Sequence, residues 1–132
     1  MDKMSYDLAG QAIGCAMKVH SALGPGFLES VYQNALVHEL RQAGLTVETG
    51  VRLEVRYDGV VVGAFAADIL VSKALLIENK AALALSPAHE VQLVNYLTAT
   101  GLDEGLLLNF GAARLEFKKK FRVYQSSAIP LS

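Results

Sequence analysis

The sequence predicts an α/β domain in which two helices precede three strands, and a third helix separates these from two further strands. Apolar residues recur at helical spacing over about residues 6–23 and 27–43, which predicts two amphipathic helices. From Thr46 to Lys80 the pattern changes to short apolar runs rich in valine, and Asp58-Gly59 between two of them is a typical hairpin turn. The expected element order is therefore α-α-β-β-β-α-β-β.

The two N-terminal helices each place one polar side chain on or beside an apolar face. His20 falls inside the apolar sector of the first helix, which is expected to end at Gly24-Pro25-Gly26. It is either a buried histidine bonded to a backbone carbonyl, or it lines a site together with Glu29. Glu29 lies at the edge of the second helix's apolar stripe, in the first turn, where the helix dipole alone would favour a carboxylate.

Charged residues interrupt the apolar runs of the predicted strands. Asp68 lies in one run, and Glu78 with Lys80 lies in the next. Strand side chains alternate, so Glu78 and Lys80 share one face. If residues 72–74 form a three-residue hairpin loop, Asp68 lies directly opposite Glu78 on that face. Charges among such apolar residues cost free energy unless they are paired or bound to an ion, so this cluster is the strongest functional signal.

The third helix is expected to begin at Ser86-Pro87, an N-cap followed by proline, and to reach about Thr100. His89, Gln92 and Tyr96 follow one another at spacings of three and four, and they form a polar stripe beside its apolar face. This stripe is either a solvated surface or one wall of a site.

The basic residues concentrate near the C-terminal end of the chain. Strands are expected over about residues 106–110 and 115–123, and the second carries most of this charge. The concentration is either a solvated strand edge that resists aggregation or a surface for phosphate contact. Its members are Arg114, Lys118, Lys119, Lys120 and Arg122.

Composition narrows the class of protein. With 132 residues, 52% hydrophobic and 19% charged, the chain is expected to form one domain over residues 1–132, with a loose tail from about residue 125. A net charge of −1 means that any nucleic-acid partner must be held by a local patch. The lone cysteine fits a cytoplasmic setting, and no apolar run reaches the roughly 18 residues that span a bilayer.

The carboxylates collected above favour a particular chemistry. Glu29, Asp68 and Glu78 would repel one another unless a cation lay among them. Carboxylate oxygens suit Mg²⁺ or Mn²⁺, and such an ion polarises a phosphoryl oxygen and lowers the pKa of bound water. Lys80 beside the ion would orient the attacking water or stabilise charge on phosphorus. The arrangement indicates a phosphodiester hydrolase.

A family resemblance supports this reading. Residues 26–32 match the signature G-x-x-E-x-x-Y, and the chain resembles the family named after it. The resemblance continues in order through Ala67-Asp68, Ile77–Ala81, residues 92–97 and residues 105–111, so it covers nearly the whole chain. That family is similar to the PD-(D/E)XK nuclease superfamily. The resemblance implies an α/β fold with a mixed central sheet flanked by helices.

The resemblance also implies roles for individual residues. Asp68 and Glu78 match the acids of the core motif, and Lys80 matches its lysine. The remaining matches are an acid on the preceding helix and a motif on the following one: Glu29, Gln92 and Tyr96. Two positions depart from the pattern. Ala66 stands where relatives often carry arginine, and Asn79 replaces an apolar residue and is expected to face away from the ion.

Together these observations predict a Mg²⁺- or Mn²⁺-dependent nuclease that acts on DNA or RNA, with Glu29, Asp68 and Glu78 holding the ion. Two alternatives stay open. The chain could be a catalytically silent nuclease-fold module that binds nucleic acid or assembles a larger complex, or a metal-dependent hydrolase of small nucleotides. A homodimer is expected under all three, because small domains with apolar strands often pair.

Overall fold

The computed structural model of the chain describes residues 7–123. The described chain forms three helices and five strands in the predicted order, so the predicted element order is confirmed. No helix in this range combines the length and the apolar composition that crossing a bilayer requires. The elements are α1 (Leu8–Leu23), α2 (Glu29–Gln42), β1 (Val47–Tyr57), β2 (Val60–Val71), β3 (Leu75–Lys80), α3 (Pro87–Thr100), β4 (Glu104–Asn109) and β5 (Glu116–Phe121).

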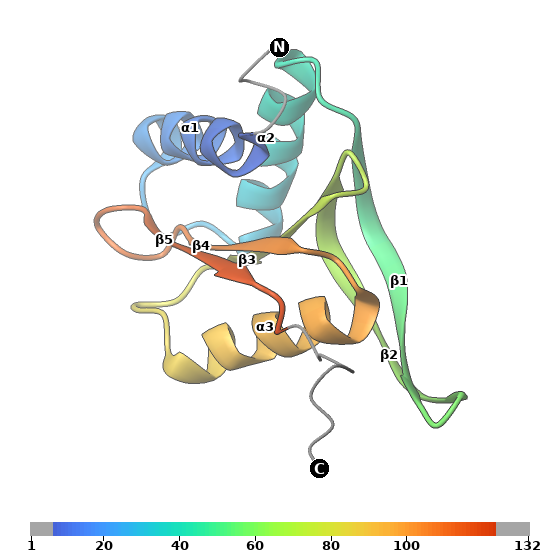
Figure 1. The fold of residues 1–132 in the computed structure, drawn as a ribbon. Coiled ribbons are helices and arrows are strands. Elements are labelled where there is room, and N and C mark those ends of the chain that lie inside the picture. Colours follow the sequence, from blue (N-terminus) through green and yellow to red (C-terminus); the bar gives the residue numbers. More distant parts are fainter. Residues whose placement is uncertain (1–6, 124–132) are drawn as a thin grey trace.

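The five strands form one mixed sheet in the order β1-β2-β3-β4-β5. Neighbouring strands are antiparallel except for β3 and β4, which are parallel and are joined through α3. A parallel pair needs such a crossover connection because the chain must return to the same end of the sheet. Helices α1 and α2 cover one face of the sheet and α3 covers the other (Figure 1). The predicted α/β class with a mixed sheet between helices is confirmed.

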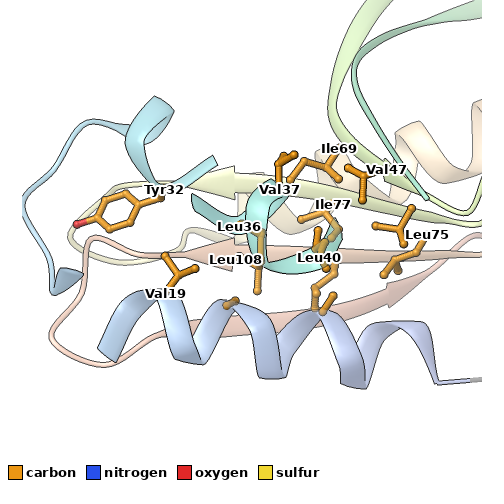
Figure 2. Packing of buried hydrophobic residues seen from close by; sticks show 14 of the residues in the cluster. Val19, Tyr32, Leu36, Val37, Leu40, Val47, Ile69, Leu75, Ile77 and Leu108 are labelled. Atoms are coloured by element: carbon orange, nitrogen blue, oxygen red, sulfur yellow. The ribbon is translucent and has the colours of Figure 1, made fainter. Parts of the chain in front are cut away.

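Two hydrophobic clusters fill the spaces on either side of the sheet. The larger one joins α1 and α2 to the strands through side chains such as Leu36, Leu40 and Ile77 (Figure 2). The smaller one lies under α3 and includes Leu76 and Leu93. Ile77 and Leu76 belong to opposite clusters because successive strand residues point to opposite faces. The near-continuous apolar run of β3 therefore reflects burial on both faces.

Strands β1 and β2 form a two-stranded ribbon, the β1–β2 ribbon, whose packing changes from one side of the sheet to the other at Asp68. Ile69 packs in the cluster beneath α1 and α2, whereas Ala67, two residues earlier, packs in the cluster beneath α3. Residues two apart on a straight strand share a face, so the ribbon must bend between them. The bend coincides with Gly50, which has a φ of 59° on the neighbouring strand. The outer part of the ribbon extends past α3 (Figure 1), and Asp68 sits at the turning point.

The loop between β2 and β3 has the predicted length. Val71 pairs with Leu75, which leaves residues 72–74 as a three-residue hairpin loop. Ser72 and Lys73 adopt positive φ values of 52° and 54°, although neither is glycine or asparagine. The amide of Ser72 donates to the carbonyl of Thr46 at 2.8 Å, a contact outside the hairpin that helps to hold this turn. The register that places Asp68 opposite Glu78 therefore follows from the loop.

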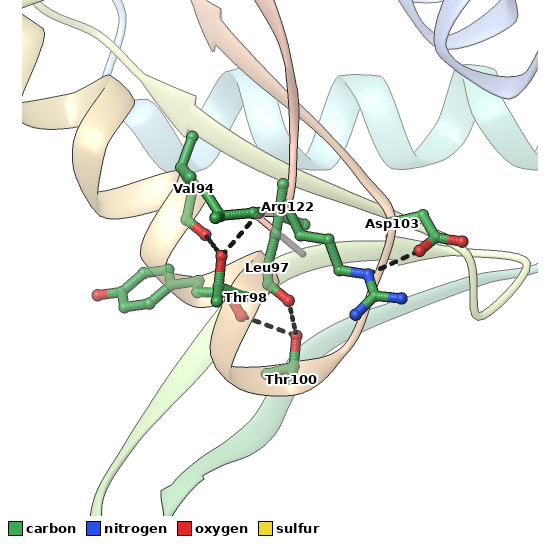
Figure 3. Close-up of polar contacts among 8 residues, drawn as sticks. Val94, Leu97, Thr98, Thr100, Asp103 and Arg122 are labelled. Atoms are coloured by element: carbon green, nitrogen blue, oxygen red, sulfur yellow. Dashed lines mark hydrogen bonds and ion pairs between the residues drawn. The ribbon is translucent and has the colours of Figure 1, made fainter. Parts of the chain in front are cut away.

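The basic stretch near the C-terminal end lies on and beside β5, an edge strand, and three of its five members contact acidic side chains. Lys119 lies 3.9 Å from Glu104, and Lys120 lies 2.6 Å from Glu90. The guanidinium of Arg122 donates to Asp103 at 2.8 Å (Figure 3). These ion pairs join the basic stretch to α3, to β4 and to the residue before β4. They favour the structural interpretation of this stretch over phosphate contact.

Candidate active site

The candidate site lies at the C-terminal end of β3, beside the parallel strand β4. Ligand sites in open α/β sheets lie at the C-terminal ends of parallel strands. The backbone of Lys80 is held here by a bond from the amide of Phe110 at 2.9 Å. The buried side chain of Asn109 accepts the amides of Ala82 at 2.9 Å and Gly111 at 3.1 Å. A methyl group at Gly111 would overlap the carbonyl of Ala82, so the loop after Lys80 packs closely against β4.

Asp68 and Glu78 meet where β2 and β3 separate. The backbone ladder between these strands ends at the pair Ile69 and Ile77. Beyond it, the amide of Asp68 donates to Glu78 Oε2 at 3.1 Å, and the amide of Asn79 donates to Asp68 Oδ2 at 2.8 Å. The two carboxylates thus replace ladder bonds, and each does so with one of its two oxygens. The structure brings the two predicted acids together.

Glu78 interacts electrostatically with four charged or polar groups, as the pKa values of Glu78 and Tyr96 show. The pKa of Glu78 rises to about 7, first because the side chain is buried and then because Asp68 is negative. The amide of Asp68 and the ammonium of Lys80 partly offset this rise in pKa, and Glu29 adds to it. The pKa of Tyr96 is also raised, by burial and by the charge of Glu78. Glu78 therefore interacts electrostatically with four of the other five predicted site residues.

The polar stripe of α3 divides into residues with different positions. Tyr96 is half-buried, and its ring stacks on Phe65 with centroids 3.6 Å apart and planes 11° from parallel. Gln92, one turn earlier, is exposed, and the structure shows no hydrogen bond between it and the two strand carboxylates. The His89 ring accepts the amide of Ser86 in a capping box at the start of the helix. His89 therefore caps the helix, Tyr96 is near enough to Glu78 for that carboxyl to raise its pKa, and the site roles of Tyr96 and Gln92 stay predictions.

The glycine and the tyrosine of the G-x-x-E-x-x-Y segment hold the loop that precedes α2. Gly26 has a φ of 112°, a conformation that side chains other than glycine rarely adopt. Tyr32 is fully buried, stacks on Phe110 with centroids 4.8 Å apart, and donates its hydroxyl to the carbonyl of Gly24. These contacts fix the loop that leads into α2. Because this loop determines where α2 begins, it also positions Glu29, which is exposed and is the first residue of the helix.

Gln33 is a site residue that the sequence did not single out. It lies one turn after Glu29 on α2, and its Nε2 donates to the carbonyl of Asp68 at 3.1 Å. Its Oε1 accepts from Nδ2 of the fully buried Asn79 at 3.3 Å. Gln33 therefore connects the helix that carries Glu29 to both strands that carry the acids. The four-residue spacing after Glu29 is the only sequence signal that could have revealed it.

Three further sequence predictions concern residues around the site. Ring atom Nε2 of His20 lies 2.9 Å from the carbonyl oxygen of Ala112, so the alternative of a carbonyl-bonded histidine is confirmed. Asn79 faces α2, whereas its neighbours in the strand face α3, as expected from alternation. It does more than fill space, because it bonds Gln33. Ala66 is exposed and brings no basic group to the site.

Replacing Gln33 with leucine is expected to lower the free energy of unfolding by about 1–3 kcal/mol, because a backbone carbonyl and a buried amide both lose a partner. Adding Asn79→Leu should recover part of this loss, since the pair then becomes apolar. Urea denaturation measures both effects. Asn34→Leu, at an exposed neighbouring position of α2, is the matched control. A loss for Gln33→Leu no larger than for the control would show that the contacts contribute nothing.

Comparison with known proteins assigns the chain to a family. Residues 6–121 match a model described as the PD-(D/E)XK nuclease superfamily, and the chain belongs to that superfamily. A solved structure titled "Crystal structure of SSO0001" superposes with a TM-score of 0.54 at 20% identity. The match covers 76% of this chain and 52% of that one, so this chain spans about half the length of that protein. At this identity the likeness shows the fold. A comparison with curated proteins finds no match.

The residues at the site fit a hard divalent ion, the kind of ion that PD-(D/E)XK nucleases generally use. Among residues 7–123, no group of three His, Cys, Asp or Glu side chains is spaced to hold a metal. Asp68 and Glu78, however, give two adjacent carboxylates, and Mg²⁺ commonly takes one or two while keeping several waters. The pKa of Glu78 is raised first by burial and then by the negative charge of Asp68, and a cation between the two carboxylates would neutralise that charge. The ligand role of Glu29 stays a prediction.

Proposed function

We propose that the protein is a Mg²⁺- or Mn²⁺-dependent phosphodiesterase that cleaves DNA or RNA. The observation that carries the proposal is the reciprocal contact of Asp68 and Glu78, with the backbone of Lys80 held on the same strand. A divalent ion would supply Lewis acidity toward a phosphoryl oxygen and toward water. Asp68 and Glu78 would hold it, and Glu29 would add negative charge from the start of α2. We also propose that the chain falls within the narrower G-x-x-E-x-x-Y family.

Lys80 has the properties that a catalytic lysine needs. It is half-buried at the end of β3, shares the strand face of Glu78, and is close enough to lower the pKa of that carboxyl. Among the residues that the structure describes, it forms no ion pair with a carboxylate. Its ammonium is therefore able to hold the attacking water or to stabilise charge that develops on the phosphate. Tyr96 and Gln92 would contact the substrate backbone from α3.

Cleavage of labelled DNA and RNA in Mg²⁺ or Mn²⁺ tests this proposal. Wild-type protein is expected to cleave at least one of these polymers, and chelation of the ion should stop the reaction. Glu78→Ala should lower the rate by 10² or more, on the scale of removing one preorganised catalytic group. Cleavage that persists undiminished in Glu78→Ala would come from a contaminant or from another site. Cleavage of nucleotides without cleavage of polymers would indicate a small-substrate hydrolase.

The second candidate function is a catalytically silent nuclease-fold module that binds nucleic acid or assembles a complex. It is favoured by the ion pairs on β5, which leave little free positive charge there to hold a polymer. A crystal grown with Mn²⁺ distinguishes the two functions. An ion bound by Asp68 and Glu78 supports the enzyme, whereas separated carboxylates with no ion between them support the silent module. The homodimer expected under either function is tested by sedimentation.

A further inference from the structure

We propose that a groove between α2 and β1 binds the phosphodiester backbone of the substrate strand next to the cleaved bond. This proposal rests on the proposed nuclease function and names where the substrate lies. The groove has a volume of about 490 Å³, and Gln33 is one of the residues that line it. All but one of the side chains that line it are polar, and they offer hydrogen-bond donors from amide, imidazole, guanidinium and hydroxyl groups. Its lining is Gln33, Asn34, Val37, His38, Arg41, Gln42 and Thr49.

The composition of the groove suits an anion. No aspartate or glutamate of residues 7–123 lines it, although the whole chain has 13 acidic residues against 12 lysines and arginines. The members on α2 form two adjacent rows with a spacing of four residues, 33-37-41 and 34-38-42, so they line one side of that helix. From Gln33 to Arg41 they extend about 12 Å at the rise of an α-helix. A line of donors of this length matches an extended phosphate backbone better than a single buried anion.

Arg41 is one of the few basic side chains among residues 7–123 that form no ion pair. Among residues 7–123, seven other lysines and arginines lie within 4 Å of a carboxylate, among them Lys73 with Glu48 and Lys18 with Glu39. Arg41 is exposed and has no carboxylate partner among residues 7–123. Its Nη2 donates to the carbonyl of Val47 at 3.0 Å, which orients the guanidinium and leaves its other donors for a ligand.

Gln33 connects the groove to the candidate active site. Gln33 lines the groove and also donates to the carbonyl of Asp68. Thr49, on the other wall, pairs with Ile69, the residue after Asp68. A strand whose phosphate lay at Asp68 and Glu78 could therefore continue along α2 past His38 to Arg41. Arginine and small polar side chains are the usual contacts of protein with phosphate, and such contacts position the backbone without reading sequence.

Binding of a fluorescent single-stranded oligonucleotide, measured by anisotropy in EDTA so that no cleavage occurs, tests the groove. Arg41→Gln is expected to weaken binding several-fold and to reduce the slope of log K against log salt by about 0.7, one phosphate contact on a single strand. Arg41→Lys should restore most of the slope, which a merely structural role would not do. Lys118→Gln is the matched control, because Lys118 is also exposed and has no carboxylate partner within residues 7–123, but lies on β5.

The groove assignment and the nuclease function can fail separately in these experiments. The assignment is wrong if wild-type protein does not bind, if Arg41→Gln binds as wild type does, or if Lys118→Gln loses as much. If inorganic phosphate displaces the labelled oligonucleotide as well as unlabelled oligonucleotide does, at an equal concentration of phosphate groups, the groove binds a single anion and not a strand. Cleavage in Mn²⁺ that needs Glu78 but not Arg41 would remove the groove and keep the nuclease. Arg41-dependent binding without cleavage would keep the groove and remove the nuclease.

Discussion

Replacing Lys80 with methionine is expected to lower the rate of divalent-ion-dependent cleavage by about 10²- to 10³-fold, the scale on which one preorganised electrostatic contact acts. The protein should still fold, because methionine keeps an apolar stem. The backbone contacts of Lys80 also stay available, since its carbonyl accepts from Phe110 and its strand pairs with β4. Losing the ammonium also removes an influence that lowers the pKa of Glu78, so rates should be compared at pH 8 or above.

Lys73→Met is the control for this prediction, because Lys73 is an exposed lysine on the loop between β2 and β3, close in sequence to Lys80. Single-turnover cleavage with saturating enzyme separates the chemical step from substrate binding. Equal rates for Lys80→Met and the control would mean that the strand lysine has no part in the chemistry. A loss of ion affinity equal to the loss of rate would instead make Lys80 a residue that organises the ion site.

Replacing Glu78 with glutamine is expected to stabilise the metal-free protein at neutral and higher pH. The unfolded carboxyl ionises near pH 4.5, but the folded one ionises near 7 because it is buried beside Asp68. The folded state therefore holds its proton more tightly, and this contribution is present in full below pH 4.5 and is lost as the pH rises through about 7. The difference amounts to at most about 3 kcal/mol of the free energy of unfolding.

Urea denaturation of metal-free protein between pH 4.5 and 8 measures this effect. Wild type should lose stability across that interval, and Glu78→Gln should lose less. Glu48→Gln is a suitable control, because Glu48 is a partly buried acid on β1 that lies 3.6 Å from Lys73, away from the candidate site. Parallel curves for wild type and Glu78→Gln would show that Glu78 ionises normally in the folded protein. A site that is more stable without its acid is what a functional cluster of like charges predicts.

Sequence patterns anticipated the fold because most of its determinants are local. The helical periodicity, the Asp58-Gly59 turn and the Ser86-Pro87 helix start each act over a few residues, and the structure shows all three. The three-residue loop fixed the register of β2 and β3, so alternation alone was enough to bring Asp68 and Glu78 together. The match of the chain to the PD-(D/E)XK superfamily agrees with this outcome.

Other features could not be predicted because they depend on contacts between distant segments. The bend of the β1–β2 ribbon at Gly50 decides where Asp68 points, yet glycine inside a strand has several possible roles. Gln33 became important only when α2 docked against Asp68 and Asn79. The basic residues of β5 proved to be largely paired, since Glu90, Glu104 and Asp103 come from elements that lie beside β5 only in the folded chain.

The central claim is that Asp68 and Glu78 form a site for a divalent ion, and calorimetric titration with Mn²⁺ tests it without any choice of substrate. Asp68→Asn is the decisive variant, because the amide keeps an oxygen acceptor for the amide of Asn79 while removing the charge. Asp58→Asn makes the same change at the exposed β1–β2 turn. The account predicts that wild type and Asp58→Asn bind one ion and that Asp68→Asn does not. Absence of binding by wild type, or equal binding by Asp68→Asn, would contradict it.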